Sequence, residues 1–403
     1  MITKRIIIFL ISILLITTSI LNADELSKKK AIKYYKQGLS LFSQGNYNDS
    51  LVYFRESCKL EPNSPDSFRM VAQIYAKFGN YELSEKYYKI IINILNKKKN
   101  YNYLSDVYSD LGHLHTLKGD YKRALSSFNK SLLLYSKSKN HKKLANVHNN
   151  IGSIYQYMGN TDRALVYFKK ALNIDIRINN KQSIAIDYNN IGYIFKLKNE
   201  YDKAISYYEK AIKIFYDLQL INKLGISYNN IGEIFRLKND INSALSYYKR
   251  AIYYLKSTNA YDDLVMVYNN LGGLYYKLDK IEIAKYFYQL GINYSDLSQP
   301  NIIFSKCYEN LATLYLNQKD NERAFVLFHK SFYLYLKLGH SNKTLEMIKK
   351  LDLLRKSVNY NLLDSIEKTN FSTLLNNIAI TYKSIKLYQN AIKYYQQALD
   401  ILV

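Results

Sequence analysis

A spacing of 40 residues recurs through most of this 403-residue chain and constrains its fold more than any other feature. Small residues return at this interval in three parallel columns. The columns are Gly112, Gly152, Gly192, Gly232, Gly272 and Ala312; Ala124, Ala164, Ala204, Ala244, Ala284 and Ala324; and Ser131, Ala171, Ala211, Ala251, Gly291 and Ser331. Because the columns stay in phase over six units, the sequence predicts a repeat protein whose units pack on their neighbours.

Each repeat has the pattern of two amphipathic helices joined by a tight turn. Apolar residues follow helical spacing over residues 188–195 and again over residues 204–215, with a short polar segment at 197–201 between them. Gly119 and Gly159 occupy that turn in two other repeats, where a left-handed backbone conformation can end the first helix. The scarcity of turn residues, with 3 Pro and 14 Gly in the chain, argues against a β-rich alternative.

These helical hairpins resemble the tetratricopeptide repeat family. The first unit fits the 34-residue form at Tyr34, Gly38, Leu41, Gly45, Tyr47, Ser50, Phe54, Ser57 and Pro62. The middle units are similar to the 40-residue variants of kinesin light chain-type adaptors, because Asn-Asn-Ile-Gly or Asn-Asn-Leu-Gly begins at Asn149, Asn189, Asn229 and Asn269. The resemblance implies an all-α fold, a right-handed α-solenoid superhelix of helix-turn-helix repeats.

The resemblance extends over a repeat array at residues 24–403, with about nine repeats. It weakens near residues 340–370, because the step from Ala312 to Ala379 is longer than one repeat. We therefore expect a degenerate unit in that segment.

Residues 1–23 form a separate unit with the three-part pattern of a secretory signal. Lys4 and Arg5 precede the apolar run 6–16, and the more polar stretch that follows ends in the small residue Ala23. The apolar run is short for a membrane span, which needs roughly 20 residues. We expect cleavage after Ala23 and export to the periplasm or the medium; an uncleaved N-terminal anchor is the alternative.

The resemblance implies that the first helix of each hairpin lines a concave groove that binds a peptide or protein segment. On it we expect an Asn column: Asn150, Asn190, Asn230, Asn270 and Asn310. An Asn amide both donates and accepts, so it can hold a peptide main chain or a terminal carboxylate. The same amide could instead join neighbouring helices.

Tyr193, Lys196, Glu233 and Arg236 lie one turn further along the expected groove helices. Lys196 and Arg236 would favour an acidic segment or a C-terminal carboxylate. The alternative is that these cations are ordinary solvated residues, since the chain is rich in Lys, Asn, Ile and Tyr throughout. Its formal charge of +24 is spread along the array without a nucleic-acid motif, so we expect no nucleic-acid partner and at most weak adhesion to anionic membrane surfaces.

No catalytic, metal or cofactor motif accompanies the repeats. Two cysteines cannot form a four-thiolate zinc site, and the chain has no phosphate-binding Gly loop or nucleophile elbow. The sequence therefore predicts a non-catalytic protein-interaction scaffold with no cofactor. The alternative is a sensory or regulatory module that acts with a separate signalling output protein. Partner identity and oligomeric state are not predictable from the sequence.

Overall fold

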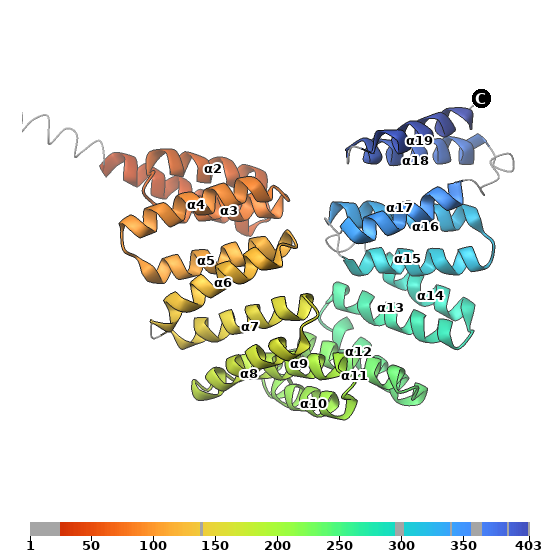
Figure 1. Cartoon of the computed structure of the whole chain (residues 1–403), viewed down its shortest axis with the longest axis horizontal. Helices are drawn as coiled ribbons and strands as arrows, with labels where there is room; N and C mark the ends of the chain where they lie inside the picture. Colours follow the sequence, from red (N-terminus) through yellow and green to blue (C-terminus); the bar gives the residue numbers. More distant parts are fainter. Residues whose placement is uncertain are drawn as a thin grey trace, which may run out of the picture. The chain divides into compact units, whose positions relative to one another are not determined.

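The computed structural model describes residues 25–137, 140–294, 302–338, 341–355, 365–384 and 387–401. Every regular element in these residues is a helix (Figure 1). The proposed signal, residues 1–23, lies outside the described residues. The predicted all-α solenoid of helical hairpins is confirmed.

The helices follow one another with short turns. After a helix at residues 25–43 come α2 (Tyr47–Leu60), α3 (Pro65–Lys77), α4 (Tyr81–Lys97), α5 (Tyr101–Leu117), α6 (Tyr121–Ser136), α7 (His141–Tyr157), α8 (Thr161–Arg177), α9 (Lys181–Leu197), α10 (Tyr201–Asp217), α11 (Ile221–Leu237), α12 (Ile241–Lys256), α13 (Tyr261–Lys277), α14 (Ile281–Asn293), α15 (Ile302–Asn317), α16 (Asn321–Lys337), α17 (Ser341–Arg355), α18 (Ser365–Ser384) and α19 (Tyr388–Asp400).

The chain divides into two compact units, unit 1 up to Lys198 and unit 2 from Asn199 onward. In unit 1, α3 packs on α4, α5 on α6 and α7 on α8; in unit 2, α11 packs on α12, α13 on α14, α15 on α16 and α18 on α19. We call the first helix of each hairpin the A helix and the second the B helix. Each B helix also contacts the next A helix, as α6 contacts α7 and α12 contacts α13.

The segment expected to be degenerate contains α17, which packs on α16. Residues 356–364 after it lie outside the described part, and α18 then opens the last hairpin with α19.

The column of small A-helix residues lets an aromatic ring of the B helix lie directly on the A-helix backbone. A Cβ added to Gly112 would come within 2.6 Å of the Phe128 ring, and one added to Gly272 within 2.5 Å of the Tyr288 ring. These rings are buried. The small residue and the ring therefore fix the distance between the two helices of a hairpin.

Side chains and backbone turns mark the helix ends. Asn80 and Asp120 cap their helices by accepting a hydrogen bond from the backbone N–H three residues later, at 3.3 and 3.1 Å. Gly119 and Gly159 have φ of 74° and 75°, so the predicted left-handed turn between A and B helices is confirmed.

Candidate functional site

The A helices of unit 1 are linked to one another mainly by charged side chains. Arg69 on α3 donates from Nε to the Asp110 carboxylate on α5 at 2.6 Å. Lys143 on α7 contacts the Asp106 carboxylate on α5 at 2.6 Å. Successive A helices therefore lie side by side in this unit, with ion pairs that set their register.

In unit 2, hydrogen bonds between Asn side chains link successive A helices in place of most of these ion pairs. Asn270 Nδ2 on α13 donates to Asn229 Oδ1 on α11 at 3.0 Å, and Asn310 Nδ2 on α15 donates to Asn269 Oδ1 on α13 at 2.8 Å. Further along in unit 2, Lys350 on α17 and Glu309 on α15 form an ion pair at 2.9 Å. The Asn column predicted from the sequence thus bridges A helices here, which was the structural alternative.

One stripe of each A helix consists of the Asn-column position and the positions three and seven residues after it. We call it the A-face stripe. In unit 1 it consists of Asp110, His113 and Leu117 on α5, Asn150, Ser153 and Tyr157 on α7, and Asn190, Tyr193 and Leu197 on α9. In unit 2 it consists of Asn230, Glu233 and Leu237 on α11, Asn270, Gly273 and Lys277 on α13, and Asn310, Thr313 and Asn317 on α15.

The unit 1 stripe ends in a row of exposed apolar side chains. Leu117, Tyr157 and Leu197 are 59%, 58% and 43% exposed, and each occupies the same place on its A helix. Tyr157 stacks on Tyr121 with ring centroids 5.9 Å apart, which holds its ring in one orientation. The three residues therefore form a row of exposed apolar side chains, one on each of three successive A helices.

The unit 2 stripe ends mostly in polar groups that already have partners. Lys277 Nζ donates to Asn239 Oδ1 at 3.1 Å, and Asn317 Nδ2 donates to the Tyr276 hydroxyl at 2.8 Å. Only Leu237 at this end of the stripe is apolar, with 44% of its surface exposed.

The predicted Asn residues differ in how far they are engaged. Asn150 Nδ2 lies 3.2 Å from His113 Nε2, whose ring packs edge-on against Phe128. Asn230 is buried. Asn190 is half-buried, and among the described residues no hydrogen bond engages its side chain.

The four predicted residues beside the Asn column also fall on the A helices. Lys196 Nζ lies 4.5 Å from the centroid of the Tyr193 ring, and only 8% of Lys196 is exposed. Arg236 and Glu233 on α11 approach to 3.9 Å. Lys196 therefore offers little surface to an acidic ligand, and Arg236 has a carboxylate beside it already.

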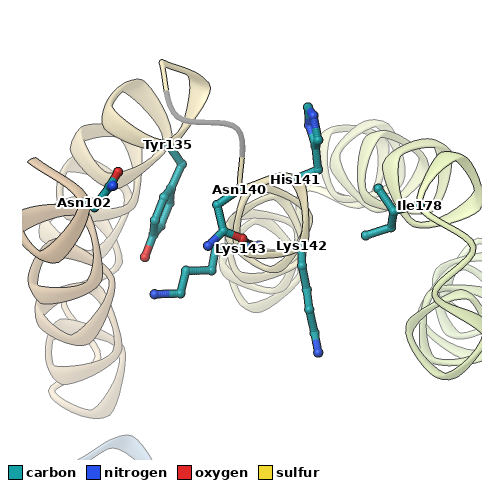
Figure 2. Close-up of a pocket in the computed structure, with 7 residues that line it drawn as sticks. All are labelled: Asn102, Tyr135, Asn140, His141, Lys142, Lys143 and Ile178. Carbon is teal, nitrogen blue, oxygen red and sulfur yellow. Dashed lines mark hydrogen bonds between the residues drawn. The ribbon is translucent and has the colours of Figure 1, made fainter.

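A pocket of about 560 Å³ in unit 1 was not predicted (Figure 2). It is lined by Asn102 on α5, Tyr135 on α6, the cap residue Asn140, the α7 residues His141, Lys142 and Lys143, and Ile178 after α8. Figure 2 shows the Tyr135 hydroxyl and the Lys143 ammonium extending to the same side. Both bind the Asp106 carboxylate, so these two polar groups of the lining already have a partner within the protein.

The charged residues that join α3, α5 and α7 were not predicted from the sequence. Asp66 and Asp106 share one column, 40 residues apart, and Tyr103 donates from its hydroxyl to Asp66. Burial and the Asp66 carboxylate raise the pKa of Tyr103. The repeated acid was a signal for such a network, but its partners Tyr103 and Lys143 each lie 37 residues after the acid rather than one 40-residue repeat away.

The cysteines and other potential metal ligands do not form a site in the described part of the chain. Cys58 and Cys307 are buried thiols, and burial raises the pKa of each to about 12. Over the described ranges, no group of three or more His, Cys, Asp or Glu side chains could hold a metal ion. Within the same ranges, no helix has the length and apolar character of a membrane span.

Comparison with known families identifies the hairpins. Profiles of the tetratricopeptide repeat match residues 65–137 and 143–217, residues 33–64, 226–254 and 372–401, and residues 305–338. Together they cover more than half of the chain, which belongs to the tetratricopeptide repeat family.

Curated relatives match over a short segment. Photosystem I assembly protein Ycf3 of Prochlorococcus marinus strain NATL1A is 37% identical over 65 residues, which is 15% of this chain and 38% of the relative. The protein of the same name from strain MIT 9301 is 38% identical over 69 residues, 16% of this chain and 40% of the relative. The chain spans about two fifths of the length of these relatives.

Solved structures of similar fold cover more of the chain. Aspartyl phosphate phosphatase F from Bacillus subtilis has a TM-score of 0.53 at 18% identity, over 92% of this chain and 93% of that one. Apo RapI has a TM-score of 0.55 at 18% identity, over 66% and 97%. A Rap protein complexed with competence and sporulation factor has a TM-score of 0.50 at 13% identity, over 82% and 98%. At these identities the likeness shows the fold.

Proposed function

We propose that the protein is a non-catalytic scaffold that binds an extended protein segment on the A-face stripe of unit 1. The observation that carries this proposal is the row formed by Leu117, Tyr157 and Leu197. These large apolar side chains are exposed on three successive A helices although burial in the core would be more favourable. Membership of the tetratricopeptide repeat family supports a protein-binding role in general.

The stripe offers two kinds of contact to such a segment. Asn150 and Asn190 place amide groups at the start of the stripe on α7 and α9, where they can hydrogen-bond a partner main chain. Leu117, Tyr157 and Leu197 lie two turns further along and would receive apolar side chains. The partner is therefore a peptide segment with apolar side chains at intervals. The preference for an acidic or C-terminal segment stays a prediction, which the low exposure of Lys196 weakens.

Selection of peptides from a random phage-displayed library, followed by titration of the selected peptides, tests this proposal. The double variant Leu117→Ala, Tyr157→Ala removes two exposed members of the row and loses only the stack of Tyr157 on Tyr121, so it should fold and should weaken selected peptides by about tenfold or more. Its matched control is Val166→Ala, Ile176→Ala on α8, where both side chains are 51% exposed on a B helix. The control should bind like the parent.

The proposal would be overturned if the selected peptides bound the Leu117 and Tyr157 variant as tightly as they bind the parent protein. It would also be overturned if the α8 control, rather than this variant, lost affinity for them. Circular dichroism of each variant shows whether a loss of binding follows from a loss of structure.

A regulatory module that acts with a separate output protein is the second candidate. It is favoured by the likeness over most of the chain to a Rap protein that holds competence and sporulation factor. That likeness supports a shared fold only, so this candidate ranks below the scaffold. A signalling protein that co-purifies with the chain, and whose activity changes when the chain is added, would reverse the order.

We also propose that the chain is exported, because residues 1–23 have the pattern of a secretory signal. Expression in a bacterial host, cell fractionation and N-terminal sequencing test this. A mature protein that begins at Asp24 outside the cytoplasm is expected, and one that keeps Met1 in the membrane fraction would favour the N-terminal anchor. A chain with an intact N-terminus in the cytoplasm would contradict export.

A further inference from the structure

One junction between repeats in unit 1 has two aspartates where the other junctions have mostly apolar core residues. Asp187 occupies the A-helix column that elsewhere contains Ser67, Val107, Val147, Ser227, Val267 and Cys307. Asp175 occupies the B-helix column that, in the other repeats whose residue at this position is described, contains Leu95, Tyr135, Phe215, Leu255 and Tyr335. The equivalent residues in these other repeats are all buried, so the two acids replace core residues on facing helices.

Both carboxyl groups are completely buried, with 0% of either residue exposed. Asn149 Nδ2 on α7 donates to Asp187 Oδ1 at 2.6 Å, and Asn180 Nδ2 in the turn before α9 donates to Asp175 Oδ1 at 3.3 Å. The second oxygen of each carboxyl, Oδ2, has no donor among the described residues other than the opposite acid.

Two ionised carboxylates in such a site would repel each other without water to screen them. In unit 1 the amide groups that face the pair are Asn149 and Asn180, and the charge that acts on it is Lys142 of α7. Burial raises the pKa of Asp175, and burial with the neighbouring Asp175 raises the pKa of Asp187 to about 8. A single proton between the facing oxygens would satisfy both, because one acid then donates to the other.

We propose that Asp175 and Asp187 share one proton near neutral pH, and that its loss in mildly alkaline solution loosens the packing of α8 on α9. The pair would then act as a pH-sensitive contact between α8 and α9. Because Asn190, Tyr193 and Leu197 lie on α9, loosening would change the last helix of the unit 1 A-face stripe. The proposal rests on the buried pair and does not depend on what the stripe binds.

The direction of the effect follows from proton linkage. In the unfolded chain both carboxyls titrate at about 3.9, whereas in the folded chain Asp187 keeps its proton up to about pH 8. Between these values the folded state binds more protons than the unfolded state. The free energy of unfolding therefore falls as pH rises through this window, and the stabilisation from the shared proton is gone above it.

Two measurements on the full-length protein test the proposal. Infrared difference spectroscopy should show the carbonyl band of a protonated carboxylic acid near pH 7 and lose it on titration through about pH 8. Hydrogen–deuterium exchange, corrected for its intrinsic pH dependence, should accelerate in α8 and α9 by about tenfold or more between about pH 6 and about pH 9.5, since one unit of pKa corresponds to a tenfold change in protonation. The α3–α4 hairpin should show no such acceleration.

Asp187→Asn is the informative variant, because its amide can donate to Asp175 and still accept from Asn149. It should abolish the infrared band and keep α8 and α9 protected at high pH. Asp175→Phe with Asp187→Val, which restores residues that other repeats use, should do the same. The control is Asp162→Asn on α8, whose carboxylate is 82% exposed beside Lys198 and should leave both readouts unchanged.

Absence of the acid band near pH 7, or equal protection of α8 and α9 at both pH values, would overturn the proposal. A cation bound between the two acids would also overturn the proposal. In that case, Ca²⁺ or Mg²⁺ would restore the protection of α8 and α9 at high pH, and EDTA would remove this protection at neutral pH.

Discussion

Unit 1 and unit 2 are built from the same hairpin but join one hairpin to the next with different chemistry. Ion pairs such as Arg69–Asp110 link the A helices of unit 1, whereas amide pairs such as Asn310–Asn269 link those of unit 2. The small-residue column and its aromatic partners are common to both. The hairpin interior therefore sets the fold, and the residues between hairpins are where two units of one array can diverge.

One arrangement between hairpins nevertheless recurs in both units. In each unit a B-helix tyrosine and a lysine of the next A helix converge on one carboxylate. The two sets are Tyr135, Asp106 and Lys143 in unit 1, and Tyr335, Glu309 and Lys343 in unit 2. The tyrosines lie 200 residues apart and so do the lysines, but the acids do not share a column. An acid at either of two A-helix positions three residues apart can thus complete the same contact.

The largest expected effect tests whether the hairpin interior is equivalent in the two units. Gly152→Val in unit 1 and Gly272→Val in unit 2 each force a branched side chain against a buried ring, Phe168 or Tyr288. Each should lower the free energy of unfolding by about 3 kcal/mol. Denaturant unfolding measures the loss, and hydrogen exchange shows which unit opens. A large loss in one unit with none in the other would break the equivalence.

Gly273→Ala is the matched control for Gly272→Val. A Cβ at Gly273 has only the Tyr288 hydroxyl within 4 Å, at 3.7 Å. The added methyl should favour the helix and stabilise unit 2 by about 0.5–1 kcal/mol. Valine rather than alanine is used at the small-residue column because Ala72 and Ala312 already occupy it in two repeats.

Removal of an ion pair tests the charged linkage of unit 1. Asp110→Ala leaves the Arg69 guanidinium, whose side chain is 29% exposed, without its partner. We expect a loss of about 2 kcal/mol, measured by denaturant unfolding, with faster exchange in α3 and α5. Asp162→Ala, which removes an exposed partner of Lys198, should cost no more than about 0.5 kcal/mol. Equal losses of unfolding free energy in the two variants would mean that the partial burial of the Arg69–Asp110 pair does not increase its contribution to stability.

Apart from the controls, the smallest effect on stability is expected for the amide linkage of unit 2. Asn310→Ala removes the donor to Asn269 and should cost about 1 kcal/mol, with faster exchange in α13 and α15. The loss should not change between low and high salt, because no charge is involved, whereas the loss for Asp110→Ala should shrink as salt rises. A salt-dependent loss for Asn310→Ala would remove the distinction between the units.

The hairpins were predictable because small residues and apolar stripes repeat at fixed intervals. Even the left-handed turn between A and B helices could be placed from Gly119 and Gly159. Later repeats make the same turn without glycine, at Asn199, Asn239 and Asp279, with φ near 60°. Asn and Asp tolerate this conformation better than most residues, so the signal was present in a weaker form.

The candidate site was only partly predictable. The Asn column fell on the A helices as expected, but whether an amide meets a ligand or a neighbouring helix depends on what lies across the junction. Asn270 and Asn310 find another Asn there, and Asn150 finds His113. The exposed row of Leu117, Tyr157 and Leu197 shares one column and was missed, since single apolar residues at a helix end resemble core positions in sequence.

The contact between a small A-helix residue and its aromatic ring is completed within one hairpin, as between Gly112 and Phe128. Gain or loss of a whole hairpin during evolution therefore leaves every such contact intact, whereas an insertion of part of a hairpin breaks one. Homologues should therefore differ in length by whole hairpins. The length of partner segment that such an array can bind would change with the number of hairpins, while the structure of each hairpin stays the same.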